Sequence, residues 1–223
     1  KDKIQKDQKK FFNEHSSVDI ILTQHTPLLD HYANKEQYEG FEWIADSHSI
    51  LDYGCGTATS IDRFFATGRN QKDYEFIGVD IADKALEKSR NKYPQYKFYV
   101  IENNKLDKVD DESIDSAYII HVLHHSTGHE QFLKEIYSKL KPGGKLLMND
   151  LSSRNPIINL GRNLFGAMPQ FVKKRFSNDL VVNDAIPDKY SVNIDLTFSL
   201  LKKTGFKIVK VGYGHLFFFL FLW

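Results

Sequence analysis

Cysteine and charge imbalance are what this sequence most clearly lacks, and each shortage excludes a class of protein. The single cysteine, Cys55, cannot form a disulfide within the chain, so a disulfide-stapled scaffold is excluded. The 30 lysines and arginines are nearly balanced by 29 acidic side chains, which leaves a formal charge of +1. We therefore expect no globally basic nucleic-acid binder.

Long apolar runs are missing as well. The segment HLFFFLFLW, residues 215–223, is shorter than the roughly 20 apolar residues that a membrane-spanning helix requires. The segment KDKIQKDQKK, residues 1–10, lacks the apolar stretch of a signal peptide. These absences favour a cytoplasmic protein. We assign no residue to a metal, and the sequence leaves the oligomeric state open.

What the sequence does contain is a regular alternation of short apolar segments and helical patterns. With 223 residues, 41% hydrophobic and 26% charged, the chain fits one globular domain. Segments rich in β-branched or aromatic residues predict five parallel strands, at 49–54, 75–80, 97–102, 115–120 and 144–150. Helical patterns lie between them at 60–66, 84–92 and 130–140. This alternation predicts an α/β fold with a doubly wound sheet and right-handed crossovers.

The borders of the sheet can also be anticipated. Residues 97–102 alternate more strongly than the other segments, which favours a place near an edge. A helix expected at 194–203 and ended by Gly205 precedes two last strands, at 206–212 and 215–223. Because only two residues separate those strands, the second should run antiparallel to the first. The sheet would then have seven strands, mostly parallel, with an antiparallel last strand. Contact of residues 215–223 with a membrane surface, or the start of a longer apolar segment, stays open.

We expect a single domain with segments added to its core. Its parts are an N-terminal helical region (1–48), a core (49–150), an insertion (151–192) and a last helix with two strands (193–223). The insertion combines apolar residues with a basic cluster formed by Arg162 and by Lys173 to Arg175. It is compatible with a lid over a small apolar or anionic molecule, with contact to a membrane surface, and with a packed helix.

A glycine-rich turn, ILDYGCGTATS at residues 50–60, joins the first strand to a helix. Gly54 and Gly56 let the backbone approach a ligand at the carboxyl end of the strand, where doubly wound sheets bind their ligands. A dinucleotide fingerprint would need glycine in place of Thr59, and no P-loop follows. Asp52 would repel phosphates but can attract an ammonium group, directly or through water. Its alternative role is to cap the turn.

Further polar residues follow two other predicted strands. Asp80 ends one of them, and its carboxylate can accept the hydroxyl protons of a ribose. Ile81 can cover one face of a nucleobase, Glu102 can accept from an exocyclic amine, and the Asn103 amide can donate to a ring nitrogen. With the glycine turn, these positions match a nucleoside that carries an amino acid and no phosphate. Solvated strand ends remain the alternative for Asp80 and Glu102.

Four segments together resemble the class I S-adenosylmethionine-dependent methyltransferases. The resemblance covers residues 49–150 well and 194–223 in outline, and it lies in ILDYGCGTA, GVDI, IDSAYIIHVLHH and LKPGGKLLMND. The first segment resembles the family's D/E-x-G-x-G-x-G motif, although Ala58 stands where the third glycine is usual.

The resemblance implies a Rossmann-like methyltransferase fold, S-adenosylmethionine as cofactor and S-adenosylhomocysteine as product. The cofactor-binding residues expected from these segments are Asp52, Gly54, Cys55, Gly56, Asp80, Ile81, Glu102, Asn103 and His121. His121 is expected to contact the methionine portion through its backbone. Cys55 has no paired histidine base nearby in the sequence, so we do not expect it to act as a nucleophile.

Methyl transfer from a sulfonium is an in-line displacement, so proximity and alignment can supply most of the rate enhancement. A general base is needed only where the acceptor must lose a proton early. The sequence offers His121, His124 and His125 after the fourth strand and Asp150 after the fifth. We carry His124 and Asp150 as the catalytic candidates, and each of them can instead be structural.

We expect the acceptor to be a small molecule, bound by the segments added to the core. No basic and aromatic strip suited to single-stranded nucleic acid is found. Methyl transfer to protein or RNA remains an alternative. So does a protein that uses this fold for binding, for regulation or for another reaction of a nucleoside ligand.

Overall fold

The computed structural model describes residues 37–151, 192–213 and 217–222, together with Lys6, Lys9, Lys10, Asn13 and Lys35. The predicted insertion and most of the predicted N-terminal helical region lie outside these residues. No helix in the described part of the chain is long and apolar enough to cross a membrane.

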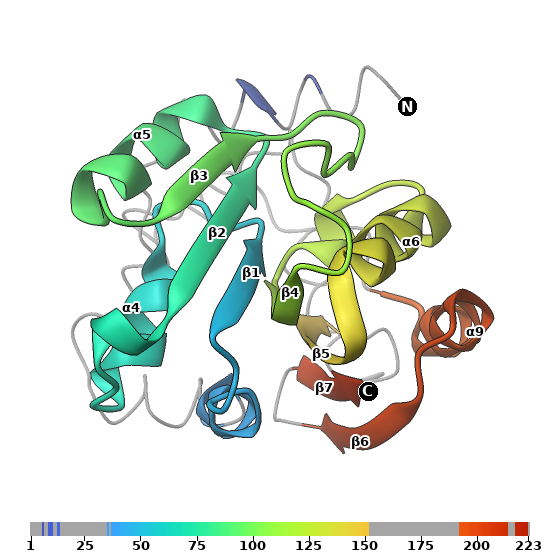
Figure 1. The fold of residues 1–223 in the computed structure, drawn as a ribbon. Helices are drawn as coiled ribbons and strands as arrows, with labels where there is room; N and C mark the ends of the chain where they lie inside the picture. The colour runs from blue at the N-terminus through green and yellow to red at the C-terminus, as the bar shows by residue number, and fades with distance from the viewer. Residues whose placement is uncertain are drawn as a thin grey trace, which may run out of the picture.

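A seven-stranded sheet forms the centre of the molecule (Figure 1). Its strands are β1 (Ser49–Tyr53), β2 (Glu75–Asp80), β3 (Lys97–Val100), β4 (Ile114–Ile120), β5 (Leu140–Leu151), β6 (Ile208–Tyr213) and β7 (Phe217–Leu222). They lie in the order β3-β2-β1-β4-β5-β7-β6. β7 runs antiparallel to both β5 and β6, and the other strand pairs are parallel. The predicted strand number, the antiparallel last strand and the edge position of β3 are confirmed.

Helices cover both faces of this sheet. They are α4 (Thr59–Ala66), α5 (Asp83–Lys92), α6 (His129–Lys139) and α9 (Ile194–Thr204), with short 3₁₀ turns η1 (Gln71–Asp73) and η2 (Leu123–His125). Residues 37–43 are helical too. The predicted bounds of α4, α5, α6 and α9 hold to within one residue. Gly205 ends α9 with φ 114, and its amide donates to the carbonyl oxygens of Leu201 and Lys202, as a left-handed cap does.

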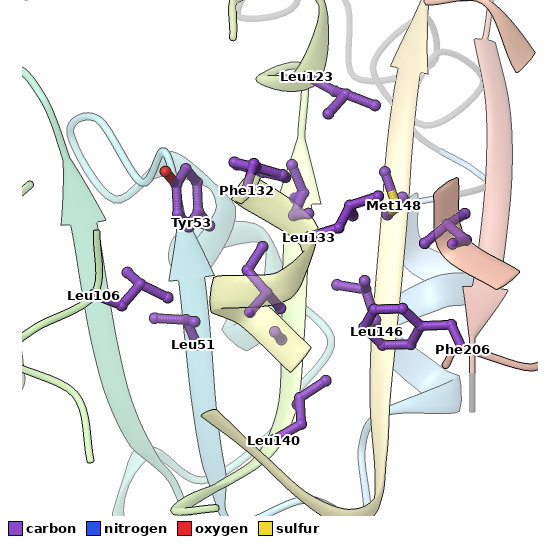
Figure 2. Close-up of a cluster of buried hydrophobic side chains, with 14 of the residues drawn as sticks. Leu51, Tyr53, Leu106, Leu123, Phe132, Leu133, Leu140, Leu146, Met148 and Phe206 are labelled. Carbon is purple, nitrogen blue, oxygen red and sulfur yellow. The ribbon is translucent and has the colours of Figure 1, made fainter. Parts of the chain in front are cut away.

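The two faces are packed with different side chains. The face under α6 and α9 is mainly aliphatic: Leu51 of β1, Leu133 of α6 and Leu146 of β5 meet there (Figure 2). The opposite face is aromatic, and Phe41 packs edge-on against both Phe64 and Tyr118, with ring centroids 5.5 Å apart. Each such fully buried side chain stabilises the fold by about 1.5–3 kcal/mol relative to an exposed one.

The strand order places a ligand crevice at β1. β2 lies on one side of β1 and β4 on the other. The helix α4, which follows β1, packs into the aromatic face, whereas α6, which follows β4, packs into the aliphatic face. The carboxyl ends of strands at such a reversal are where open α/β sheets bind their ligands.

Candidate active site

The glycine turn after β1 is held against β2 by its backbone. The amides of Gly54 and Cys55 both donate to the carbonyl oxygen of Val79, over 2.7 and 3.1 Å. Gly54 has φ 78 and Gly56 has φ 50, the left-handed region that favours glycine. The main chain therefore fixes this turn where the sequence predicted it.

The two glycines are needed for different reasons. A Cβ added to Gly54 would lie 2.2 Å from Cγ2 of Val122, so the protein's own packing leaves no room for a side chain. A Cβ added to Gly56 would meet nothing within 4 Å. The sequence did not anticipate the contact with Val122. Gly56 is the glycine beside which a ligand has space.

Ala58, which stands where the third glycine is usual, keeps the glycine conformation. It has φ 62 and precedes α4 as its N-terminal cap residue. A non-glycine residue in this region costs about 1–2 kcal/mol. Its methyl group is fully buried in the aromatic-face cluster, and this burial stabilises the fold by about 0.8 kcal/mol.

Asp80 binds the backbone of the glycine turn. Its Oδ2 accepts from the amide of Gly56 over 2.9 Å, and its Oδ1 accepts from the amide of Ala82 over 2.8 Å. Burial raises the pKa of Asp80 above its ordinary value, and these backbone hydrogen bonds oppose the shift. Cys55 lies between this carboxylate and Asp52, and burial together with both charges raises the pKa of its thiol. The thiol therefore stays protonated, in line with the expectation that it is not a nucleophile.

Asp52 is a deeply buried acid at the end of β1. The residue is 2% exposed, and its Oδ2 has no hydrogen-bond partner. Burial raises the pKa of Asp52 to about 8; the nearby Tyr118 hydroxyl lowers it, and the charge of Asp80 adds to the rise. A buried carboxylate oxygen without a donor is costly, so this position suits a ligand that brings a donor or a positive charge.

Sequence reasoning missed two buried polar residues on the strands that follow in the sheet, β4 and β5. Tyr118 is the register partner of Asp52 on β4, and its buried hydroxyl has no hydrogen-bond partner. Asn149 of β5 is 4% exposed, and its Oδ1 is likewise unpartnered. Both residues lie inside apolar strand segments, so only the pairing of strands brings them to the site.

Of the residues expected around a nucleobase, Glu102 and Asn103 follow β3, whereas Ile81 follows β2. Glu102 and Asn103 both line a hollow of about 320 Å³, and Asn103 has φ 53. The side chain of Glu102 is 76% exposed and lies 3.5 Å from the ammonium group of Lys9. Ile81 is partly buried against the aliphatic cluster. The structure brings Glu102 and Asn103 together, while the base contacts themselves stay predictions.

A second polar group lies at the carboxyl ends of β4 and β5. His121, with φ 57, donates its amide to the carbonyl oxygen of Asn149 over 2.9 Å. His124 Nδ1 lies 2.5 Å from Oδ1 of Asp150, and the His124 amide donates to Oδ2 of the same carboxylate over 3.2 Å. The structure thus joins the two residues that the sequence analysis carried as catalytic candidates.

Comparison with known proteins assigns this architecture to a family. Residues 51–148 match the model of a methyltransferase domain. The chain is 26% identical to a sterol 24-C-methyltransferase of Kluyveromyces lactis, over 80% of this chain and 46% of that protein. It is 30% identical to the O-methyltransferase cnsE of Penicillium expansum, over 75% of this chain and 55% of that protein. The chain thus spans about half the length of these two curated relatives.

Solved structures agree on the fold. A SAM-dependent methyltransferase from Aquifex aeolicus superposes with a TM-score of 0.57 and 14% identity, over 78% of this chain and 81% of that chain. At this identity the likeness concerns the fold alone. Residues 51–148 thus match a methyltransferase domain, and the chain has the fold of the class I S-adenosylmethionine-dependent methyltransferases, whose first motif its glycine turn resembles.

Proposed function

We propose that this chain transfers a methyl group from S-adenosylmethionine to a small-molecule acceptor. The observation that carries the proposal is the arrangement around Gly56. Open space lies beside this residue, Asp80 binds its amide, and the buried Oδ2 of Asp52 lacks a donor. These features fit the uncharged ribose and the ammonium group of the cofactor.

Each part of the cofactor has a candidate partner. The unpartnered oxygen of Asp52 would face the ammonium group, and the remaining lone pairs of Asp80 would accept from the ribose hydroxyls. Ile81 and the Glu102–Asn103 turn would flank the adenine, and the His121 backbone would border the methionine portion. Two buried carboxyl groups also suit a ligand whose sulfonium and ammonium groups are both positive, because such a ligand favours their charged form.

The bound cofactor supplies an electrophilic methyl group on a sulfonium that is already activated as a leaving group. The chain's own contribution is to hold the acceptor in line with that methyl group and to exclude water. Rigid strand ends suit this task, because β1, β2 and β4 are joined by continuous parallel pairing.

The acceptor is proposed to be a small molecule for two reasons. The names of the curated relatives, a sterol methyltransferase and an O-methyltransferase, describe small-molecule chemistry in those proteins. The near-neutral charge of this chain offers no global attraction to nucleic acid.

Calorimetry with S-adenosylmethionine and S-adenosylhomocysteine tests the cofactor half of the proposal. We expect saturable binding of both, weakened in Asp80→Ala. The acceptor half is tested with methyl-labelled cofactor and a cell extract, separated afterwards into small molecules, protein and RNA. Label in the small-molecule fraction supports the proposal, whereas label confined to protein or RNA, or failure to bind the cofactor, contradicts it.

A further inference from the structure

His124 and Asp150 lie at the carboxyl ends of β4 and β5. These ends are next to the ends of β1 and β2, where the cofactor is proposed to bind. β4 separates β1 from β5, so the carboxyl ends of β4 and β5 lie on the side of β1 that faces away from β2. The glycine turn and Asp80 take up the β1 and β2 ends. A group that acts on the acceptor is expected beside them, within the same crevice.

The geometry of the pair fixes the ring of His124. Asp150 contacts this residue twice, through the backbone amide and through Nδ1. The 2.5 Å contact with a carboxylate requires a hydrogen on Nδ1, so the neutral imidazole carries its lone pair on Nε2. The side chains are 6% and 1% exposed, so water competes little for this contact.

Burial makes the two histidines next to the pair poor proton acceptors. Burial lowers the pKa of His121 to about 4 and that of His125 to about 3. The ring of His125 packs against that of His124 with centroids 3.8 Å apart. The charges of Asp150 and Arg63 bear on His121, and that of Asp150 bears on His125 as well.

We infer that His124 is the general base of this enzyme, that Asp150 positions it, and that the acceptor is a hydroxyl or an acidic carbon. This rests on the proposed function. The acceptor's oxygen or carbon bonds to the methyl carbon as the carbon–sulfur bond breaks, with its electron pair left on sulfur. The acceptor's proton moves to Nε2 of His124, and Asp150 holds the imidazolium that results.

The acceptor class follows from what other acceptors require. A neutral amine or a carboxylate presents a lone pair without losing a proton first, so an oriented base would add little. A hydroxyl or a carbon acid becomes a strong nucleophile only as its proton leaves. If the pair only held η2 against β5, the hydrogen bond from the His124 amide to Asp150 would suffice. Here the Asp150 carboxylate also fixes the ring of His124.

The first test reads the tautomer and needs no acceptor. ¹⁵N-histidine NMR of the wild-type protein with S-adenosylhomocysteine should show neutral His124 protonated at Nδ1 and bare at Nε2. In Asp150→Asn the amide can donate to Nδ1, so the proton should move to Nε2. A wild-type ring protonated at Nε2 would overturn the inference, because it leaves no lone pair for the acceptor's proton.

The second test identifies the atom methylated. Cofactor labelled with ¹³C in its methyl group is incubated with a small-molecule cell extract, and ¹³C NMR separates O-methyl, C-methyl, N-methyl and S-methyl products. We expect O-methyl or C-methyl products. His124→Asn, which keeps a donor for Asp150, and Asp150→Asn should each lower kcat by at least about 100-fold with little change in KM. His48→Asn, at an exposed histidine that precedes β1, is the matched control and should stay within a few fold.

Two outcomes separate this inference from the function on which it rests. N-methyl products formed equally fast by wild type and His124→Asn would refute the base and leave small-molecule methyl transfer standing. Absence of cofactor binding would instead refute the proposed function.

Discussion

The ends of β1 and β2, proposed as the cofactor side, and the ends of β4 and β5, proposed as the acceptor side, are built by different means. At the β1 and β2 ends, backbone amides make the defining contacts. The amides of Gly54 and Cys55 donate to the Val79 carbonyl, and the amide of Gly56 donates to Asp80. At the β4 and β5 ends, the defining contact joins the His124 ring to the Asp150 carboxylate. The first arrangement uses mainly backbone groups and the second uses two side chains, although Gly56 and Asp80 are 24 positions apart and His124 and Asp150 are 26 positions apart.

This difference explains how one fold can serve many acceptors. A backbone-built site changes little when side chains change, so the cofactor side can stay constant. A site defined by a few side chains can change its chemistry by single substitutions. Gly54, whose Cα faces Val122, and Asp52, which is paired in register with Tyr118, lie where the two sides meet.

Gly54→Val should break the junction between the two sides and have the largest effect. The new side chain would meet Val122 from a backbone at φ 78, so overpacking and strain add to about 3–6 kcal/mol of unfolding free energy. Urea unfolding measures the loss. Gly56→Val should instead leave the chain folded by circular dichroism and abolish cofactor binding. A stable Gly54→Val protein would show that Val122 can move aside.

Asp52→Asn tests the cofactor side through the pH dependence of the unfolding free energy. Burial raises the pKa of Asp52 to about 8 from an ordinary value of 3.8. Between these values the folded chain retains a proton that the unfolded chain has lost, so the contribution of Asp52 to wild-type stability should fall as pH rises through this range. The slope is at most about 1.4 kcal/mol per pH unit. The variant lacks this proton, and its unfolding free energy, measured in urea at several pH values, should lose that slope. Identical slopes in both proteins would mean that Asp52 is not protonated in the folded chain.

Asp80→Ala and His124→Asn should separate affinity from turnover. Loss of a buried charged acceptor is expected to weaken S-adenosylmethionine binding by about 1–3 kcal/mol in Asp80→Ala. His124→Asn should keep the affinity within about threefold, since the ring belongs to the acceptor side. Calorimetry on both variants decides the matter. Equal losses would mean that the two sides form one cofactor site.

Ala58→Gly should have the smallest effect. Glycine relieves about 1–2 kcal/mol of left-handed strain but gives up a buried methyl group and adds backbone entropy to the unfolded chain. These terms nearly cancel, so the unfolding free energy should change by less than about 1 kcal/mol and the cofactor affinity by less than threefold. A large gain in affinity would show that the alanine constrains the cofactor side.

The sequence by itself predicted the elements and the glycine turn that the structure describes, because periodicity and turn residues are features of neighbours along the chain. Apolar periodicity placed every described strand and labelled α-helix, and the glycines and acids that end β1 and β2 can be recognised from their spacing alone. Gly205 could be predicted as the end of α9 for the same reason, since a helix cap is a local feature.

Only the tertiary structure decided which distant residues meet. It placed β7 between β5 and β6, set Tyr118 beside Asp52, packed Gly54 against Val122 and brought His124 onto Asp150. None of these contacts leaves a local pattern, because strand order and register arise from burying apolar faces on both sides of the sheet. The backbone-built cofactor side could therefore be predicted from residue spacing, whereas the side-chain pair of the acceptor side required the folded chain.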